Sequence, residues 1–305
     1  MKHQRLLRCI DEITRSGSIR KAAERLNMTG SALNRRLQDL ELELGEKIFE
    51  RLPRGVRLNA AGELLVGHIR NQIADLARVR SQIDDLSGFR RGTVPIACSQ
   101  AMAHHILPIE VAAYRRNFPH VSFRVEVRDH RDALRALKEF EVDLALVFRP
   151  SAAADFQVLA VVEQRVMAVI AETHPLAQHK SVRLHDCAQY PLALPDASYG
   201  GRQILAEATG TRSFPFEPAI ESNSFEFLRN YVLLEQAVTF QIELGAPIST
   251  GAGTGLVSRP VEPHDIRPGR LVFGKLRGRA LTVASAKFAD QLILRLESAA
   301  LASSV

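Results

Sequence analysis

Residues 29–38 carry hydrogen-bonding side chains at spacings that a single helix face brings together. A rotation of about 100° per residue places Leu33 and Leu37 on one side of such a helix. The opposite side and its flanks are polar: Ser31, Arg35 and Gln38, with Asn34 and Arg36. Arginine can bond guanine bidentately, and asparagine or glutamine can bond adenine in the same way. These residue types at this spacing predict a helix that contacts base edges in the major groove of DNA.

Two short helices joined by a tight turn are expected to position this polar face. Ser18 caps the first helix, and the alanine pair at 22–23 lets the second helix approach closely across it. The turn at 27–28 leads to Thr29, which caps the second helix. The sequence therefore predicts a helix-turn-helix. A generic three-helix unit with a polar exterior is the alternative, because helix-turn-helix patterns alone give many false positives.

Residues 51–58 have the proline, glycine and β-branched content of a small hairpin, or wing. Its arginines would contact backbone phosphates and position the protein rather than read sequence: Arg51, Arg54 and Arg57. The chain carries a net charge of +6, and residues 1–58 hold 13 Lys/Arg and 8 Asp/Glu, which leaves +5 in this part. A localised basic block is typical of a module that binds a polyanion. A solvated basic face is a fair competitor on charge alone.

Residues 59–88 predict a long linker helix that begins after Asn59 and contains no proline. Two rows in it repeat every seven residues and are apolar apart from one glutamine: Ile69, Leu76 and Ile83, and Leu65, Gln72, Val79 and Leu86. Such rows form the seam of a coiled coil. We therefore expect the helix to pair with a second chain in a homo-oligomer. Packing once against its own domain is the alternative.

The remaining residues, 89–305, alternate between β-rich and helical patterns. The β-rich runs lie at 93–98, 121–128, 142–148, 164–171, 236–242, 255–261 and 270–276. The clearest helical patterns lie at 106–117, 131–140 and 225–234. This alternation predicts α/β layers with mainly parallel strands. The expected fold class is thus α/β, preceded by an N-terminal all-α winged helix-turn-helix over 1–58 and the linker helix.

Three cysteines lie far apart in the sequence: Cys9, Cys98 and Cys187. Their odd number favours reduced thiols and a cytoplasmic location. The charged N-terminus is unlike a signal peptide, and no apolar stretch approaches the ~18–20 residues of a membrane span. We therefore expect no membrane partner.

Signals for catalysis, metal and cofactors are weak. His104 and His105 are adjacent, and no thiol or carboxylate pattern accompanies them as in a metal site. The glycine-rich stretch 251–255 lacks the lysine and hydroxyl residue of a nucleotide-binding loop. Nucleophile-elbow and paired-cysteine motifs are also missing from the sequence. We expect no enzyme activity, no catalytic residue, no metal and no cofactor.

Residues 4–66 resemble the N-terminal domain of LysR-type transcriptional regulators. The matching stretches are Gly17-Ser18, Ala22-Ala23, Leu26, Ala32-Leu33, Leu37, Leu40-Glu41, Leu44-Gly45, Phe49-Glu50-Arg51 and Leu58-Asn59-Ala60-Ala61-Gly62. The C-terminal part is similar more loosely, through Phe118-Pro119, Asp143-Leu144-Ala145-Leu146-Val147 and His174-Pro175-Leu176-Ala177. The family's recognition helix often begins Ser-Gln-Pro, with a serine three residues later. Here those places hold Thr29, Gly30, Ser31 and Asn34, so the base preference cannot be carried over.

The resemblance implies a homodimer or homotetramer that binds promoter DNA and a small-molecule effector. It also implies a two-subdomain, periplasmic-binding-protein-like effector domain over 89–305. The first subdomain would hold about 90–160 and 265–305, and the second about 161–264. The effector cleft would be built from loops at strand ends, as in open α/β sheets. The matching positions are Ser99, Gln100, Met102, Phe148, Arg149, the stretch 198–202 with Ser198, Tyr199 and Arg202, and Ser222, Asn223 and Phe240.

Arg149 and Arg202 favour an effector that bears a carboxylate, although ordinary loop hydrogen bonding or a surface salt bridge explains each arginine equally well. The leading hypothesis is thus ligand-responsive control of transcription. The alternative is a solute-binding or enzymatic α/β domain whose helical head serves oligomerisation. A nonspecific architectural DNA-binding protein is a third possibility.

Overall fold

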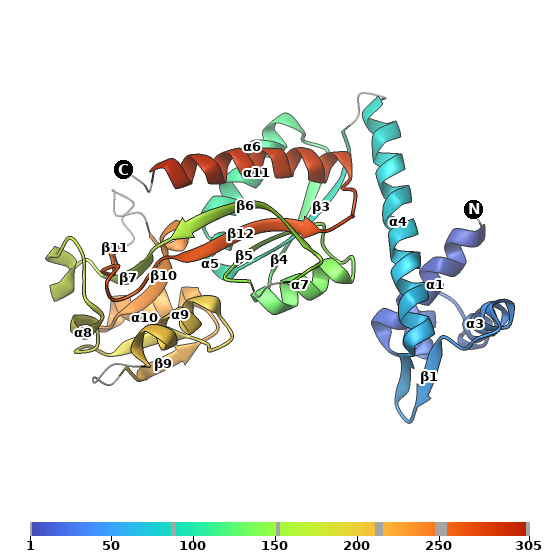
Figure 1. The fold of residues 1–305 in the computed structure, drawn as a ribbon, viewed down its shortest axis with the longest axis horizontal. Coiled ribbons are helices and arrows are strands. Elements are labelled where there is room, and N and C mark those ends of the chain that lie inside the picture. Colours follow the sequence, from blue (N-terminus) through green and yellow to red (C-terminus); the bar gives the residue numbers. More distant parts are fainter. Residues whose placement is uncertain (1, 87–89, 151–152, 211–215, 248–254, 303–305) are drawn as a thin grey trace. The chain divides into compact units, whose positions relative to one another are not determined.

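The computed structural model describes residues 2–86, 90–150, 153–210, 216–247 and 255–302. The chain divides into two compact units, Met1–Leu86 and Ser87–Val305, each with its own hydrophobic core (Figure 1). No helix in the described ranges is long and apolar enough to cross a membrane.

The first unit consists of four helices and a two-stranded wing. Its elements are α1 (Lys2–Ser16), α2 (Ile19–Arg25), α3 (Gly30–Leu44), β1 (Phe49–Leu52), β2 (Gly55–Leu58) and α4 (Ala60–Leu86). The wing strands pair antiparallel, as the content of residues 51–58 predicts. The core collects one apolar face from each helix, with Ile10, Ala22, Leu33 and Ile69 all fully buried. Because the two fully buried residues of α2 are alanines, α3 can pack closely across it.

Both expected helix caps of the helix-turn-helix are present. The Ser18 hydroxyl accepts a hydrogen bond from the backbone N–H of Lys21 at 3.4 Å, and the Thr29 hydroxyl accepts one from Ala32 at 3.3 Å. The turn between the helices is made by Asn27, whose φ of 53° lies in the left-handed region that asparagine tolerates better than most residues. The predicted helix-turn-helix is therefore confirmed down to its capping residues.

The long helix α4 starts where the wing ends and is anchored to the rest of the unit at two levels. The Asn59 side chain caps it by accepting a hydrogen bond from the N–H of Gly62 at 2.8 Å. A Cβ at Gly62 would lie 2.0 Å from the carbonyl oxygen of Ile48, so only glycine allows this approach. Farther along, Arg70 forms a largely buried ion pair with Asp11 of α1 at 2.8 Å. The last described residue of α4 is Leu86; positions 87 and 88 of the expected linker helix lie outside the described residues.

The second unit contains two sheets. The first has the strand order β4-β3-β5-β12-β6 and is formed by β3 (Gly92–Cys98), β4 (Val121–Val127), β5 (Leu144–Phe148), β6 (Phe156–Gln164) and β12 (Gly269–Leu276). Its helices are α5 (Gln100–Ala103), α6 (Ile106–Asn117), α7 (His130–Lys138) and α11 (Val283–Ala302). The helices α6 and α11 cover one face of this sheet, and α7 covers the other (Figure 1).

The second sheet has the order β10-β7-β11, and the parallel pair β8-β9 adjoins it through a bridge between Leu192 and Val238. The strands are β7 (Val166–Ala171), β8 (Leu192–Pro195), β9 (Pro218–Ser222), β10 (Thr239–Ile242) and β11 (Leu256–Pro260). The helices are η1 (Pro175–Gln178), α8 (Leu184–Cys187), α9 (Gly200–Thr209), α10 (Phe225–Leu234) and η2 (Glu243–Gly245). The chain passes between the two sheets twice, from β6 to β7 and from β11 to β12, which produces the two expected subdomains.

The prediction of mainly parallel strands is wrong. Only β3 with β4 and β5, and β8 with β9, pair parallel in the described chain. The strand β12 returns from the second subdomain and therefore runs antiparallel to β5 and β6. The predicted run at 164–171 is broken at Arg165, between β6 and β7. The strands β8 and β9 were not predicted, and neither was β6 apart from Gln164. Positions 251–254 of the glycine-rich stretch lie outside the described residues.

A buried polar cluster fixes the start of β5 against the start of α11. Asp143 forms an ion pair with Arg279 and accepts a hydrogen bond from the Ser285 hydroxyl at 2.6 Å. The Arg279 guanidinium also donates to the carbonyl of Val142 at 2.9 Å and lies over the ring of Phe140 at 4.6 Å. Burial lowers the pKa of Arg279, and the charge of Asp143 opposes this shift.

We expect Arg279→Met to lower the free energy of unfolding of this unit by about 3–5 kcal/mol, because the Asp143 carboxylate would remain buried without a counter-charge. Urea denaturation of the full chain, followed by circular dichroism, measures the loss. The control is Arg135→Met, which removes an exposed ion pair with Asp132 and should lower stability by less than about 1 kcal/mol. Similar losses for both variants would contradict this account of the cluster.

Candidate nucleic-acid interface and ligand pocket

The outward side of α3 presents the predicted polar residues. Ser31, Arg35 and Gln38 are exposed and Asn34 is half-buried, whereas Leu33 on the opposite side has no exposed surface. Within the described ranges, the Arg35 side chain makes no ion pair or hydrogen bond. The rotation expected from sequence is therefore correct, and the central arginine of this face is available to a partner.

Electrostatics at the start of the two helices favour an anion. Neither α2 nor α3 has an acidic residue in its first turn. The carboxylates of α3 lie in its second half, at Asp39, Glu41 and Glu43. Helix N-termini carry partial positive charge from unpaired backbone N–H groups, and such ends bind phosphate. The end of α3 that begins at Thr29 thus has the polarity that a nucleic-acid backbone requires.

The wing arginines differ in their surroundings. Arg51 donates to the Asn34 side chain at 3.5 Å, which connects the wing to α3. Arg57 pairs with Glu50 at 2.7 Å; first this hydrogen bond and then the charge of Glu50 raise the pKa of Arg57. Arg54 is exposed and has no partner among the described residues. Arg54 is thus the wing arginine whose charge is least compensated.

Two of the predicted DNA-contacting residues have roles inside the unit. The Ser18 hydroxyl caps α2. The Arg36 guanidinium lies 3.8 Å from the sulfur of Cys9 and 3.9 Å from that of Met28, on the side of α3 that faces α1. Arg36 is still exposed and lies at the flank of the face that Arg35 occupies, where it borders α1.

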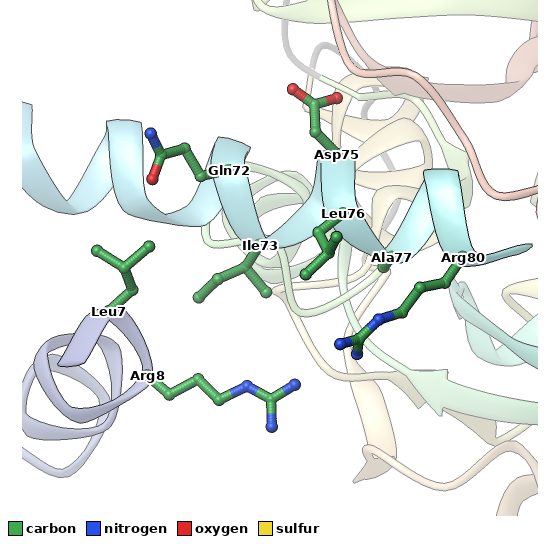
Figure 2. A pocket seen from close by; sticks show the side chains of 8 residues that line it. All are labelled: Leu7, Arg8, Gln72, Ile73, Asp75, Leu76, Ala77 and Arg80. Carbon is green, nitrogen blue, oxygen red and sulfur yellow. The ribbon is translucent and has the colours of Figure 1, made fainter. Parts of the chain in front are cut away.

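A groove of about 370 Å³ lies between α1 and the middle of α4. Figure 2 shows Leu7 of α1 and Ile73 of α4 pointing toward one another across it, with the side chains of Arg8 and Arg80 extending into the gap. Beyond the groove, the heptad residues Ile83 and Leu86 are exposed, Leu86 by 89%. The heptad rows thus divide into a first half that packs on the unit's own core and a second half that it leaves uncovered.

A small cavity of about 40 Å³ lies where the two subdomains of the second unit meet. It is lined by Ser99, Gln100, Ala101, Asp129, His130, Phe148, Pro195, Tyr199, Gly200, Gly201, Phe225, Phe240, Gln241 and Ile242. Strand ends of both sheets supply these residues, as expected for α/β layers. Five of the eleven predicted cleft residues are among them: Ser99, Gln100, Phe148, Tyr199 and Phe240.

The other six predicted positions do not line this cavity: Met102, Arg149, Ser198, Arg202, Ser222 and Asn223. Met102 is fully buried in the core. Arg149 has a φ of 49° and pairs with Glu207 at 3.0 Å beside a separate opening. The Ser222 hydroxyl is used locally, in a hydrogen bond with the backbone N–H of Ser224. The two arginines that suggested a carboxylate ligand are therefore not at the cavity.

Sequence reasoning missed seven lining residues, whereas Gly200 and Gly201 belong to the predicted stretch 198–202: those missed are Ala101, Asp129, His130, Pro195, Phe225, Gln241 and Ile242. Asp129 and His130 directly follow the predicted strand at 121–128. The strand-end rule that selected Ser99 and Phe148 would have selected these two as well. Phe225 gave no such signal, because its position depends on how the second subdomain folds over the first.

The two subdomains are joined across the cavity by a hydrogen bond from the Phe225 backbone N–H to the Gln100 side chain at 2.8 Å. Several polar atoms at the wall are buried without a partner in the described chain: Ser99 Oγ, His130 Nδ1 and Gln241 Nε2. Burial lowers the pKa of His130, so the imidazole is neutral near pH 7, although Asp129 opposes the shift. Buried polar atoms are normally hydrogen-bonded, so this wall has donors and acceptors to offer a ligand.

Reactive groups are not gathered at this cavity. The described residues contain no cluster of three potential metal ligands. Burial raises the pKa of Cys98 and Cys187 to about 12, which keeps both thiols protonated and unreactive. The arrangement is suited to binding a ligand between aromatic walls.

Family models account for nearly the whole chain. Residues 4–63 match the bacterial regulatory helix-turn-helix protein, lysR family, and residues 87–296 match the LysR substrate binding domain. The first match covers the helix-turn-helix and wing, and the second covers both subdomains around the cavity.

Curated relatives and solved structures agree with these models. The chain is 26% identical over 253 residues to a probable RuBisCO transcriptional regulator from Emiliania huxleyi, covering 78% of this chain and 81% of the relative. It is 25% identical to the transcriptional dual regulator GltC from Bacillus subtilis (strain 168), covering 68% and 70%. A full-length OxyR variant from Pseudomonas aeruginosa shares the fold with a TM-score of 0.72 at 19% identity, covering 94% of each chain. This chain therefore belongs to the LysR family and is a transcriptional regulator with a helix-turn-helix and an effector-binding domain.

Proposed function

We propose that α3 enters the major groove of operator DNA and that Arg35, Asn34, Ser31 and Gln38 contact base edges. The observation that carries this proposal is the outward, unpaired position of Arg35 on a helix whose first turn has no carboxylate. Thr29 and Ser18 lie at the helix ends that meet phosphate. The wing arginines, Arg54 above all, contact the backbone and set the register.

The proposed DNA-bound form is a dimer or tetramer of this chain. The second half of α4 exposes Val79, Ile83 and Leu86 in a row, and a single copy of the unit leaves this row in water. A second copy of α4 packed on the row and on the groove beside Leu7 would bury it. Residues 1–58 thus serve as the DNA-binding domain, 59–88 as the linker and dimerisation helix, and 89–305 as the effector-binding domain. Reduced cysteines and a DNA partner favour action in the cytoplasm.

The effector is proposed to bind in the cavity between the subdomains. Ser99 and Phe148 reach it from the first subdomain, and Tyr199 and Phe240 reach it from the second. A ligand that contacts both walls binds more tightly when the two subdomains are closed around it than when they are open. Such a ligand therefore favours the closed arrangement. Because only two chain crossings join the subdomains, closure can alter the spacing of DNA-reading heads in an oligomer.

The finer proposal is that the effector bears a carboxylate. Support for it comes from groups other than Arg149 and Arg202. The helix α9 begins at Gly200 beside the cavity and has no side-chain cap, so its first N–H groups can meet an anion. Ser99 Oγ is unpartnered at the same cavity. The acidic wall residue Asp129 is engaged as the cap of α7 through a hydrogen bond at 2.8 Å.

We expect the association constant K for duplex DNA to fall steeply with salt. For each phosphate that the protein neutralises, log K should fall by about 0.9 per tenfold increase in salt concentration. Arg35→Ala should relax preference at one base pair by about 1–3 kcal/mol, because a bidentate base contact is lost. Arg54→Ala should lower the affinity for all duplexes alike. It should also reduce the slope of log K against the logarithm of salt concentration by about 1. Fluorescence anisotropy with operator and scrambled duplexes at several salt concentrations measures both effects.

The matched control is Arg116→Ala, an exposed arginine on α6 whose loss should change neither quantity. Failure of the chain to bind duplexes at low salt would contradict DNA binding and favour a solute-binding or enzymatic protein. A salt slope without sequence preference would indicate an architectural DNA-binding protein.

We expect Ser99→Ala to lower the affinity for a carboxylate effector about tenfold or more, because a hydrogen bond to a charged group contributes about 1.5–3 kcal/mol. Arg149→Ala should change its affinity less than twofold. A panel of small acids and their amides, screened by thermal stabilisation and then titrated by calorimetry, supplies the ligand. If amides bind as well as acids, the carboxylate assignment is wrong.

A further inference from the structure

Another opening of the effector-binding domain lies apart from both the ligand cavity and the opening beside Arg149. It has a volume of about 610 Å³ and lies between the turn that joins α5 to α6 and the helix α10. The turn contributes His104 and His105, and α10 contributes Glu226, Arg229 and Asn230. The opening thus gathers polar side chains from both subdomains, and none of these residues lines the ligand cavity.

The Arg229 guanidinium is partly buried at this opening and has no carboxylate partner among the residues that the structure describes. Its Nη2 donates to the Gln241 side-chain oxygen and to the carbonyl oxygen of Gly245, both of them neutral. Its Nε is buried without a hydrogen bond to any described residue. The residues outside the described ranges cannot supply a side-chain counter-charge, because none of them is Asp or Glu. Among the described residues, Arg229 is therefore a partly buried cation held only by neutral acceptors.

His104 does not change this charge balance near pH 7. Burial, and then the positive charge of Arg229, lowers the pKa of His104, while Glu226 opposes the shift. Neutral His104 can still donate one hydrogen bond, as can the Asn230 amide. Glu226 is exposed at the rim, where water screens its charge. An isolated buried charge is unfavourable unless a counter-ion approaches it.

We propose that this opening binds a small oxyanion, a carboxylate or a phosphate, with the Arg229 guanidinium as its principal partner. Planar guanidinium groups bind such anions through charge-assisted hydrogen bonds. The site also touches the ligand cavity, since Gln241 accepts from Arg229 while its own amide nitrogen lies unpartnered at the cavity wall. An anion that draws on Arg229 competes with this hydrogen bond and frees the Gln241 side chain to reorient.

The test measures binding of inorganic phosphate and of acetate to the full chain by calorimetry, at an ionic strength held constant with chloride. Arg229→Met should lower the affinity for the anion about tenfold or more, because charged hydrogen bonds are lost. Glu226→Gln should tighten binding about two- to fivefold, because it removes an exposed like charge. An unfolded variant could not bind more tightly, so the second change distinguishes a local charge effect from a folding defect.

The matched control is Arg116→Met, which removes the same charge from an exposed position on α6 and should leave anion affinity unchanged. Saturable binding of phosphate alone would identify a phosphate site, and binding of acetate alone a carboxylate site; either supports the proposal if Arg229→Met and Glu226→Gln act in opposite directions. Absence of saturable binding by both anions, or equal affinity in Arg229→Met, would overturn it. Acetate is a small acid like the proposed effector, so Ser99→Ala serves to separate the two sites: it removes a ligand-cavity contact and should leave anion binding at Arg229 unchanged.

Discussion

The close packing of α3 across the alanine pair Ala22 and Ala23 is the constraint on which the DNA-facing surface depends. Both alanines are buried, and the absence of larger side chains lets Leu33 and Leu37 enter the core of the first unit. Once those leucines are fixed inside, the 3.6-residue period leaves the side of Arg35 facing outward. Hydrophobic burial thus sets the orientation of α3. The helix caps and the turn fix where the helices begin and end, and the wing adds positive charge.

The first unit could be predicted from sequence almost completely, because its determinants are local. Ser18, Thr29 and Asn59 cap helices within three residues of themselves, and the heptad rows lie on one continuous helix. What sequence could not supply is contact between side chains on different elements. The Glu50 pair that compensates Arg57 and the sulfur contacts of Arg36 at the border with α1 both arise from the packed unit.

The ligand cavity was predicted only in part, for a related reason. Strand ends are visible as local patterns, so Ser99 and Phe148 were found from the rule that ligands bind there. Whether a side chain at such an end points into the cavity depends on backbone detail: Arg149 has a positive φ and pairs with Glu207 instead. The strand direction of β12 and the placement of Phe225 depend on how the chain returns between subdomains, and no short stretch encodes this.

The ligand cavity and the opening at Arg229 are physically connected through a side-chain contact. Gln241 on β10 lies at the ligand cavity, and Arg229 on α10 lies at the other opening. The hydrogen bond between them satisfies the oxygen of the Gln241 amide but leaves the amide nitrogen unpaired. A ligand acceptor beside that nitrogen would orient the amide and strengthen its hold on Arg229. An anion at Arg229 would weaken it. Because binding linkage is reciprocal, the two occupants must then oppose one another by equal free energies.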